Sequence, residues 1–233
     1  MSVYYVTGIQ GGVGKSFVTF LTLETFKNDN PLVIDTDTDN PNVYQACRYK
    51  DENNNVQYKH EAIKIDTDTI DGWEKLMSVI DNNRDRQIII NTPARNKKAI
   101  KKYGEFLDAL VNNGIDVVSL FVINNKQDSI NHLRDYLEYV HTKICVIKNQ
   151  GTSEDIDFEK FDNCSYAKNG IANILLKTTS QSIQNEIFNN RKIIEDLFKD
   201  GSMSFRIIIE SWFKKNGDTI KNAIDMASVY NAG

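Results

Sequence analysis

The residues best suited to chemistry lie near the start of the chain, in the segment TGIQGGVGKSF (residues 7–17). Three glycines leave room for successive backbone N–H groups to turn towards one anion, because no Cβ stands in the way. Lys15 could then reach the β- and γ-phosphates of a nucleotide, and the Ser16 hydroxyl could bind Mg²⁺. The segment therefore predicts a phosphate-binding loop, followed by a helix whose N-terminus also favours an anion.

One position in this loop departs from the common phosphate-loop pattern G-x-x-x-x-G-K-[ST]. Ile9 occupies the place of the first glycine. A glycine-rich turn that arose by chance is the alternative, but the apolar run before the loop and the helical pattern after it favour phosphate binding. The residues that we expect to contact the nucleotide here are Gly11, Gly12, Val13, Gly14, Lys15, Ser16 and Phe17.

A cluster of acidic residues follows in the segment VIDTDTDNPNVY. Asp35, Asp37 and Asp39 come directly after a second apolar run. Carboxylates beside a polyphosphate repel it unless a cation lies between them, so the cluster favours a magnesium site or a site for an attacking water. A solvated turn of Asp and Asn residues is the alternative.

Short apolar runs alternate with helical patterns along most of the chain. We expect strands at residues 3–6, 32–34, 88–90, 120–123, 144–147 and 174–176, and helices at 16–26 and 128–139. This alternation predicts an α/β fold with a doubly wound, mostly parallel sheet flanked by helices. We expect one domain over residues 1–233, in which residues 180–233 form a helical C-terminal part. Ligands of such sheets bind at the carboxyl ends of the strands, where the motifs above lie.

The GGVGKS core resembles the deviant Walker A loop of the ParA/MinD family of P-loop ATPases, whose pattern is KGGxGK[ST]. The IDTD segment is similar to the family's second acidic motif, IDxDPQ. That similarity implies that Asp35 acts on the attacking water and that Asp37 supports the metal site. The family's signature lysine, which reaches the nucleotide of the partner subunit, is replaced here by Gln10. A glutamine can donate a hydrogen bond but cannot neutralise charge that develops in the transition state.

The segment QIIINTPARN resembles the family's Walker B strand, which ends in D-x-P-P or D-x-P-A. Asn91 stands in the place of the acid, and its amide oxygen brings no negative charge to Mg²⁺. The replacements at Gln10 and Asn91 together predict a bound nucleotide more firmly than fast hydrolysis. The leading hypothesis is an ATP-bridged homodimerisation switch with slow or partner-stimulated turnover. A nucleotide-binding pseudo-ATPase that acts as an adaptor or scaffold is the alternative, and an ATP-dependent ligase is a third possibility.

Two segments compete for recognition of the base. Residues 125–128, NKQD, fit the N-K-x-D motif with which GTPases read guanine. That motif follows the first strand after the Walker B strand, whereas the family's base-recognition loop follows the next strand. There Asn149 resembles the family's adenine-contacting asparagine, and an asparagine can pair with the N6 and N7 edge of adenine. The resemblance therefore implies ATP rather than GTP.

The resemblance also implies partners. The segments DTDTDNPNVY, INTPA and VINNKQDSI resemble those of ATPases that are encoded in plasmid transfer and stability regions. This resemblance implies a role in plasmid partition or conjugation. It also implies two partners, DNA bound without sequence preference and a plasmid-encoded protein. Solvated helix faces are the alternative explanation for the basic residues, and no interleaving of aromatic and basic residues indicates base stacking. The candidate DNA contacts are Arg191, Lys192, Arg206, Lys214, Lys215, Lys97, Lys98, Lys101 and Lys102.

Composition limits the remaining possibilities. The chain of 233 residues has a net charge of −4, which argues against bulk electrostatic binding of nucleic acid but permits a local basic patch. Its three cysteines are widely spaced without a CxxC pair, which favours a reducing compartment over a disulfide framework or a zinc site. No apolar run approaches the roughly 18 residues of a membrane span. We expect a cytoplasmic protein without a stable membrane anchor.

Overall fold

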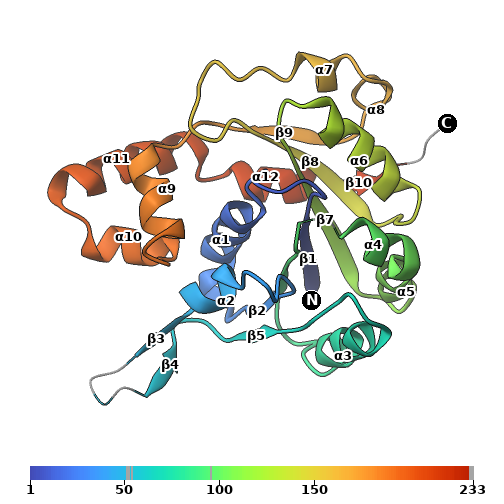
Figure 1. Ribbon diagram of the computed structural model, residues 1–233, viewed down its shortest axis with the longest axis horizontal. Helices are drawn as coiled ribbons and strands as arrows, with labels where there is room; N and C mark the ends of the chain where they lie inside the picture. The colour runs from blue at the N-terminus through green and yellow to red at the C-terminus, as the bar shows by residue number, and fades with distance from the viewer. Residues whose placement is uncertain (51–52, 54, 95, 231–233) are drawn as a thin grey trace.

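A computed structural model gives the structure of the chain and describes residues 1–50, 53, 55–94 and 96–230 (Figure 1). An eight-stranded sheet forms its centre, and a separate two-stranded hairpin projects from one side. The strands of the sheet are β1 (Ser2–Thr7), β2 (Leu32–Asp35), β5 (Ala62–Lys64), β6 (Ile88–Asn91), β7 (Asp116–Ile123), β8 (Lys143–Asn149), β9 (Asn173–Leu176) and β10 (Ser228–Val229), and the hairpin consists of β3 (Arg48–Lys50) and β4 (Val56–Tyr58).

Helices cover both faces of the sheet (Figure 1). The first half of the chain contributes α1 (Lys15–Phe26), a 3₁₀ turn at Lys27–Asp29, α2 (Asn42–Ala46), α3 (Ile70–Asp81), α4 (Lys97–Tyr103) and α5 (Glu105–Asn112). The second half contributes α6 (Gln127–Leu137), α7 (Glu159–Asp162), α8 (Ser165–Lys168), α9 (Gln181–Phe188), α10 (Ile194–Asp200), α11 (Met203–Asn216) and α12 (Thr219–Met226). No helix in the described part of the chain is long and apolar enough to cross a membrane.

The order of the strands places the loop after β1 at the middle of the sheet. The strands lie in the order β5-β2-β6-β1-β7-β8, and all of these neighbours are parallel. The chain therefore moves outward from β1 in one direction, returns to β6, and continues on the other side with β7. In an open α/β sheet the ligand binds at such a reversal, outside the carboxyl ends of the strands. The predicted doubly wound, mostly parallel sheet is confirmed.

The core explains why the strands are visible as apolar runs. One buried cluster joins the sheet to α1, α2 and α9–α12, and a second joins it to α3–α7 on the opposite face. Strands that are buried on both faces are apolar throughout rather than alternating. For this reason the six predicted strands and the helices predicted at 16–26 and 128–139 are confirmed, each with ends shifted by one or a few residues.

The predicted helical C-terminal part is present, but it also contains one short strand that the sequence did not indicate. β10 pairs antiparallel with the start of β8, through Ser228 opposite Ile144 and Val229 opposite Lys143. Both of its residues are exposed, so neither an apolar run nor an alternation marks the strand in the sequence. Backbone hydrogen bonds to the sheet edge hold it instead. β5 and the β3–β4 hairpin also have only three residues per strand, and no sequence pattern predicted them.

The C-terminal helices pack on α1, the helix that follows the glycine-rich loop. The ring of Trp212 in α11 lies 5.6 Å from the ring of Phe17 in α1, measured between ring centroids. The indole Nε1 of Trp212 donates a hydrogen bond of 2.9 Å to the carbonyl of Thr178. The same side chain therefore joins α11, α1 and the segment after β9, and 7% of its surface is exposed.

Replacement of this indole tests the role of the contact. We expect Trp212→Ala to lower the free energy of unfolding by about 3–5 kcal/mol, because it removes a large buried side chain and a hydrogen bond to a carbonyl. Ile207→Ala on the same helix is the control, since Ile207 is 54% exposed and should change stability by less than about 0.5 kcal/mol. Denaturant unfolding measures both. Equal losses of unfolding free energy for the two variants would show that the Trp212 contact does not stabilise the fold.

Candidate nucleotide-binding site

The loop between β1 and α1 has the backbone that a phosphate-binding loop requires. Gly12 and Gly14 have φ angles of 73° and 99°, in the left-handed region that other residues rarely adopt. Gly14 precedes α1, a helix of 12 residues. The unpaired N–H groups of the first helical turn therefore face the loop, and they carry the positive end of the helix dipole. This arrangement suits an anion.

A glycine that the motif comparison missed starts this loop. Gly8 has a φ angle of 150°, and a Cβ at this position would lie 2.5 Å from the carbonyl oxygen of Val122 in β7. Gly8 thus supplies the close approach between the end of β1 and β7, while Ile9, in the place of the usual glycine, is buried. The dipeptide Thr7-Gly8 directly after an apolar run was the signal that could have identified it.

A cavity of about 540 Å³ opens over the loop. Eight of the ten predicted site residues line it, and they come from the loop, the acidic segment and the end of β8. They are Gly12, Val13, Gly14, Lys15, Ser16, Phe17, Asp37 and Asn149. The other two, Gly11 and Asp35, do not line it. Gly11 lines a neighbouring cavity with Gln10, and Asp35 lies beneath the surface with no exposed area.

Lys15 is buried against its own loop. Its Nζ donates a hydrogen bond of 3.1 Å to the carbonyl of Gln10. Burial lowers the pKa of Lys15 to about 8, and the nearby carboxylate of Asp37 opposes this shift. An anionic ligand would supply the further negative charge that keeps a buried ammonium protonated. Among the described residues that line the cavity, Lys15 is the cation and Asp37 is the carboxylate.

Asp35 and Asn91 form a buried pair at the ends of β2 and β6. The Asn91 side-chain amide donates a hydrogen bond of 2.9 Å to the Asp35 carboxylate. The backbone N–H groups of Asp37 and Tyr44 donate two more, of 3.2 and 3.0 Å. Burial raises the pKa of Asp35 to about 6, and these three hydrogen bonds act against the rise. A second acid at position 91 would place two carboxyl groups in contact, whereas asparagine acts as a donor.

Gln10 does not line the cavity over the loop. Its side-chain oxygen accepts a hydrogen bond of 3.2 Å from the hydroxyl of Ser129, which also lies 2.8 Å from the side-chain oxygen of Asn124. Gln10 is therefore connected to the turn between β7 and α6. The neighbouring cavity that it lines also contains Lys97, Lys98 and Lys101, three of the predicted DNA contacts.

The Asn149 side chain bridges the end of β8 and the loop. Its amide nitrogen donates a hydrogen bond of 2.8 Å to the carbonyl of Val13, and its oxygen accepts one of 3.1 Å from the N–H of Gly151. A Cβ on Gly14 would meet this amide nitrogen at 2.2 Å. Each polar atom of an asparagine amide can form two hydrogen bonds, so one donor and one acceptor remain for a base edge.

Helix α9 completes the wall beyond Asn149. Gln184 and Phe188 line the cavity one helical turn apart, and they offer an amide and a ring near the place that the base would take. Their i, i+4 spacing was visible in the sequence. What the sequence lacked was any indication that this helix lies over the loop. Of the NKQD segment, Asp128 is exposed at the start of α6 and does not line the cavity.

The residues of the cavity fit a nucleotide with a divalent cation. The exposed loop glycines leave room for phosphate oxygens, since nothing lies within 4 Å of a Cβ built on Gly12. The Ser16 hydroxyl and the Asp37 carboxylate line the same cavity, and both are oxygen ligands of the kind that Mg²⁺ prefers. A nucleotide of the size of ATP needs a cleft of a few hundred Å³, and the cavity provides one.

Comparisons with known proteins agree with this geometry. No protein-family model matches the chain. MobD of Acidithiobacillus ferrooxidans is 29% identical over 219 residues, which cover 91% of this chain and 92% of MobD. A Borrelia burgdorferi B31 structure assigned to plasmid partition and bound to AMPPNP is similar, with a TM-score of 0.57, 15% identity, and coverage of 94% of this chain and 98% of that chain. A chain of the MinC–MinD cell division complex of Aquifex aeolicus is also similar, with a TM-score of 0.51 at 14% identity over 100% and 99% of the two chains.

The chain has the ParA/MinD fold. The loop of this fold, with Gly12, Lys15 and Ser16, occupies the reversal point of the sheet. Within the ParA/MinD fold, the side chains of Gln10 and Asn91 form hydrogen bonds to other parts of the protein. The resemblance seen in the sequence is thus confirmed at the level of the fold.

Substitution of Gly8 tests the close approach between β1 and β7. Gly8→Ala should lower the free energy of unfolding by roughly 1–3 kcal/mol, because the new methyl group meets the Val122 carbonyl and the positive φ is strained. Gly11→Ala is the matched control: its Cβ would have Ala94 at 3.7 Å as its nearest neighbour, an ordinary contact. Thermal and denaturant unfolding measure both variants. A Gly8→Ala protein as stable as Gly11→Ala would contradict the proposed close approach.

Substitution of Asn91 tests the buried pair of Asn91 and Asp35. Asn91→Asp replaces a donor with a second carboxyl group, so at pH 8 we expect a loss of about 2 kcal/mol of stability. When folding raises the pKa of a carboxyl group, the free energy of unfolding of the protein falls as the pH rises through that pKa. At pH 5 the pair can share a proton, and the loss should shrink.

Denaturant unfolding between pH 5 and pH 8 measures this difference. The control is Asn169→Asp, an exposed position after α8, which should show no such pH dependence. A loss for Asn91→Asp that is the same at both pH values would show that the two carboxyl groups do not interact.

Proposed function

We propose that the chain is an ATP-binding homodimerisation switch that positions plasmid DNA or a transfer or partition complex. The observation that carries this proposal is the single cavity in which Lys15, Ser16, Asp37 and Asn149 meet. Lys15 would hold the phosphates, Ser16 and Asp37 would hold Mg²⁺, and Asn149 would contact adenine. The similarity to a nucleotide-bound structure assigned to plasmid partition supports the class of function.

Dimerisation would follow from the positive charge of the protein face on which the loop lies. The neighbouring cavity, of about 980 Å³, is lined by Gln10, Gly11 and three lysines, so the surface beside the phosphates is positively charged. Asp135 pairs with Lys97, which leaves Lys98 and Lys101 as the excess charge, and two such faces repel each other unless negative charge lies between them. Two ATP molecules would supply that charge, because each stays negatively charged near neutral pH even with Mg²⁺ bound. ATP would therefore bridge the two copies.

Turnover would be slow or would depend on a partner. The side-chain oxygen of Gln10 is held by Ser129, and glutamine has no charge with which to stabilise the transition state. For Asp35 to act on an attacking water, its carboxylate, which is fully buried and already accepts three hydrogen bonds, would first have to become accessible to that water. A partner that shifts this segment, a plasmid-encoded protein or DNA, would provide that change.

The same hydrogen bonds favour a second candidate, a nucleotide-binding pseudo-ATPase that acts as an adaptor or scaffold. In that case Asn91 and Gln10 keep the loop and the ends of β2 and β6 in place, and nucleotide binding alone would determine assembly. Phosphate release, measured with and without DNA, separates the two candidates. Release by the wild type that Lys15→Ala abolishes would exclude the scaffold.

Removal of the Lys15 ammonium tests the proposed switch. Lys15→Ala should weaken ATP binding at least about tenfold, because a charge-assisted hydrogen bond to phosphate is lost, and should abolish the dimer formed with ATP and Mg²⁺. Lys221→Ala, at an exposed position in α12, is the control. Titration calorimetry and light scattering measure affinity and mass. A wild type that stays monomeric with saturating ATP would contradict the switch.

The affinity for ATP should also depend on pH in a defined direction. Phosphate binding favours the charged ammonium, and burial lowers the pKa of Lys15 to about 8 in the free protein. ATP affinity should therefore fall as the pH rises through about 8, which is well below the usual pKa of a lysine. Calorimetry between pH 7 and pH 9.5 measures it. An affinity that is constant over this range would show that Lys15 does not contact the phosphates.

A further inference from the structure

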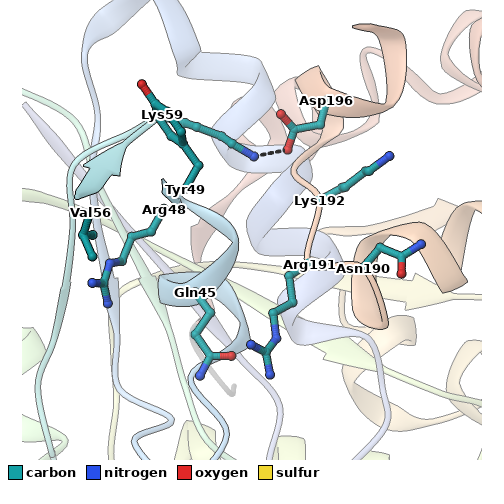
Figure 2. A pocket seen from close by; sticks show the side chains of 9 residues that line it. All are labelled: Gln45, Arg48, Tyr49, Val56, Lys59, Asn190, Arg191, Lys192 and Asp196. Atoms are coloured by element: carbon teal, nitrogen blue, oxygen red, sulfur yellow. Dashed lines mark hydrogen bonds and ion pairs between the residues drawn. The ribbon is translucent and has the colours of Figure 1, made fainter. Parts of the chain in front are cut away.

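A second basic cavity, of about 490 Å³, lies between the β3–β4 hairpin and the turn that joins α9 to α10 (Figure 2). It shares no lining residue with the nucleotide cavity in the described part of the chain. Four cationic side chains and one carboxylate line it, together with two side-chain amides. The charged residues are Arg48, Lys59, Arg191, Lys192 and Asp196.

The charge of this cavity is only partly compensated. Asp196 forms an ion pair with Lys59, and Glu186, beside the cavity, forms one of 3.1 Å with Lys192. Among the described residues, neither Arg48 nor Arg191 has a carboxylate within ion-pair distance. The two guanidinium groups therefore give the cavity an excess of positive charge, although the whole chain is acidic. Such a local excess favours an anionic ligand.

Two tyrosine rings fix the Arg48 guanidinium. Its central carbon lies 4.8 Å from the ring centroid of Tyr44 and 5.6 Å from that of Tyr58. Its Nε is buried without a hydrogen-bond partner in the described structure. Stacking on a ring orients a guanidinium but does not use its N–H donors. The guanidinium is thus held in place, and its terminal nitrogens, rather than the buried Nε, would meet an acceptor from outside.

Arg191 stands where a glycine would fit the backbone better. Its φ angle is 52°, and the N–H of Lys192 bonds back to the carbonyl of Glu186 at 3.2 Å, six residues earlier. Helices commonly end in this way with a left-handed residue, which is usually glycine. An arginine here strains the backbone. Because its side chain lines the basic cavity (Figure 2), a ligand contact would explain the strained residue.

The hairpin places exposed aromatic rings beside these cations. Tyr49 is 48% exposed and Tyr58 is 49% exposed. Arg48 lies opposite Tyr58 in the antiparallel pair. Because side chains alternate along a strand, Arg48 and Tyr58 share one face of the hairpin, whereas Tyr49 and Lys59 share the other. Aromatic and basic residues therefore do interleave here, contrary to the expectation from the sequence.

We propose that this hairpin and cavity bind single-stranded nucleic acid. Arg48 and Arg191 would contact phosphates, and Tyr49 and Tyr58 would stack on bases. Exposed rings beside cations are the combination that proteins use for unpaired strands. A duplex would satisfy the charges but keeps its bases stacked on each other, and an acidic peptide offers no flat rings. The amide of Asn190 can pair with base edges.

Fluorescence anisotropy without ATP tests the proposal. The probes are a labelled oligothymidylate of about 20 nucleotides, a duplex of the same length, and an oligoglutamate peptide. We expect the single strand to bind at least tenfold more tightly than either competitor, and its affinity to fall as the salt concentration rises. Equal or tighter binding of the duplex or of the peptide would overturn the proposal, as would the absence of binding to the single strand.

Variants separate binding from folding. Tyr49→Ala and Tyr58→Ala should each weaken single-strand binding about tenfold, because stacking on one base is lost. Arg191→Gly should weaken it severalfold while the melting temperature stays the same or rises, since glycine relieves the strained backbone. Arg84→Ala, at an exposed residue paired with Asp81, is the charge-matched control and should bind as the wild type does.

The proposal is overturned if Arg191→Gly or both tyrosine variants keep full affinity for the single strand. The Lys15→Ala variant should also keep this affinity, because the hairpin lies outside the nucleotide cavity. Loss of strand binding therefore leaves the nucleotide switch standing, and loss of ATP binding leaves the strand site standing.

Discussion

A buried hydrogen bond links the side chains of Asn91 and Asp35 beneath the nucleotide cavity. It joins the ends of β6 and β2 at a distance of 2.9 Å, and Asp35 is fully buried. Asp37, two residues later, then lies at the surface of the cavity. With an acid in place of Asn91, the same position would hold two carboxyl groups in a medium that disfavours both charges. The departure from the Walker B pattern is thus physically consistent with the buried Asp35.

The loop depends on contacts from strands that are far apart in the sequence. Gly8 allows the end of β1 to approach Val122 in β7, Gln10 bonds to Ser129, and Val13 bonds to Asn149 in β8. All of these contacts occur at the carboxyl ends of the central strands, where the sheet topology brings the loops together. A change at any of these loops therefore alters the geometry of the loop around Lys15.

The sequence predicts the parts of this structure that obey local rules. Strands buried on both faces, such as β6, appear as apolar runs, and the glycines around Lys15 mark a backbone that few residues can adopt. Contacts between distant segments have no such signal: Gln10 and Ser129 are 119 residues apart. The β3–β4 hairpin was missed because three residues per strand are too few for a detectable period, and most of its described side chains are exposed. Arg48 and Tyr58 come to lie on the same face only when the strands pair.

A single-turnover experiment with γ-labelled ATP and Mg²⁺ tests the central claim most directly, that this loop binds nucleotide while Gln10 and Asn91 slow its cleavage. The wild type should bind one ATP per chain and retain most of it intact over a time in which Gln10→Lys, which restores the missing charge, cleaves its bound ATP. A wild type that binds no ATP, or that cleaves it as fast as Gln10→Lys, would contradict the claim.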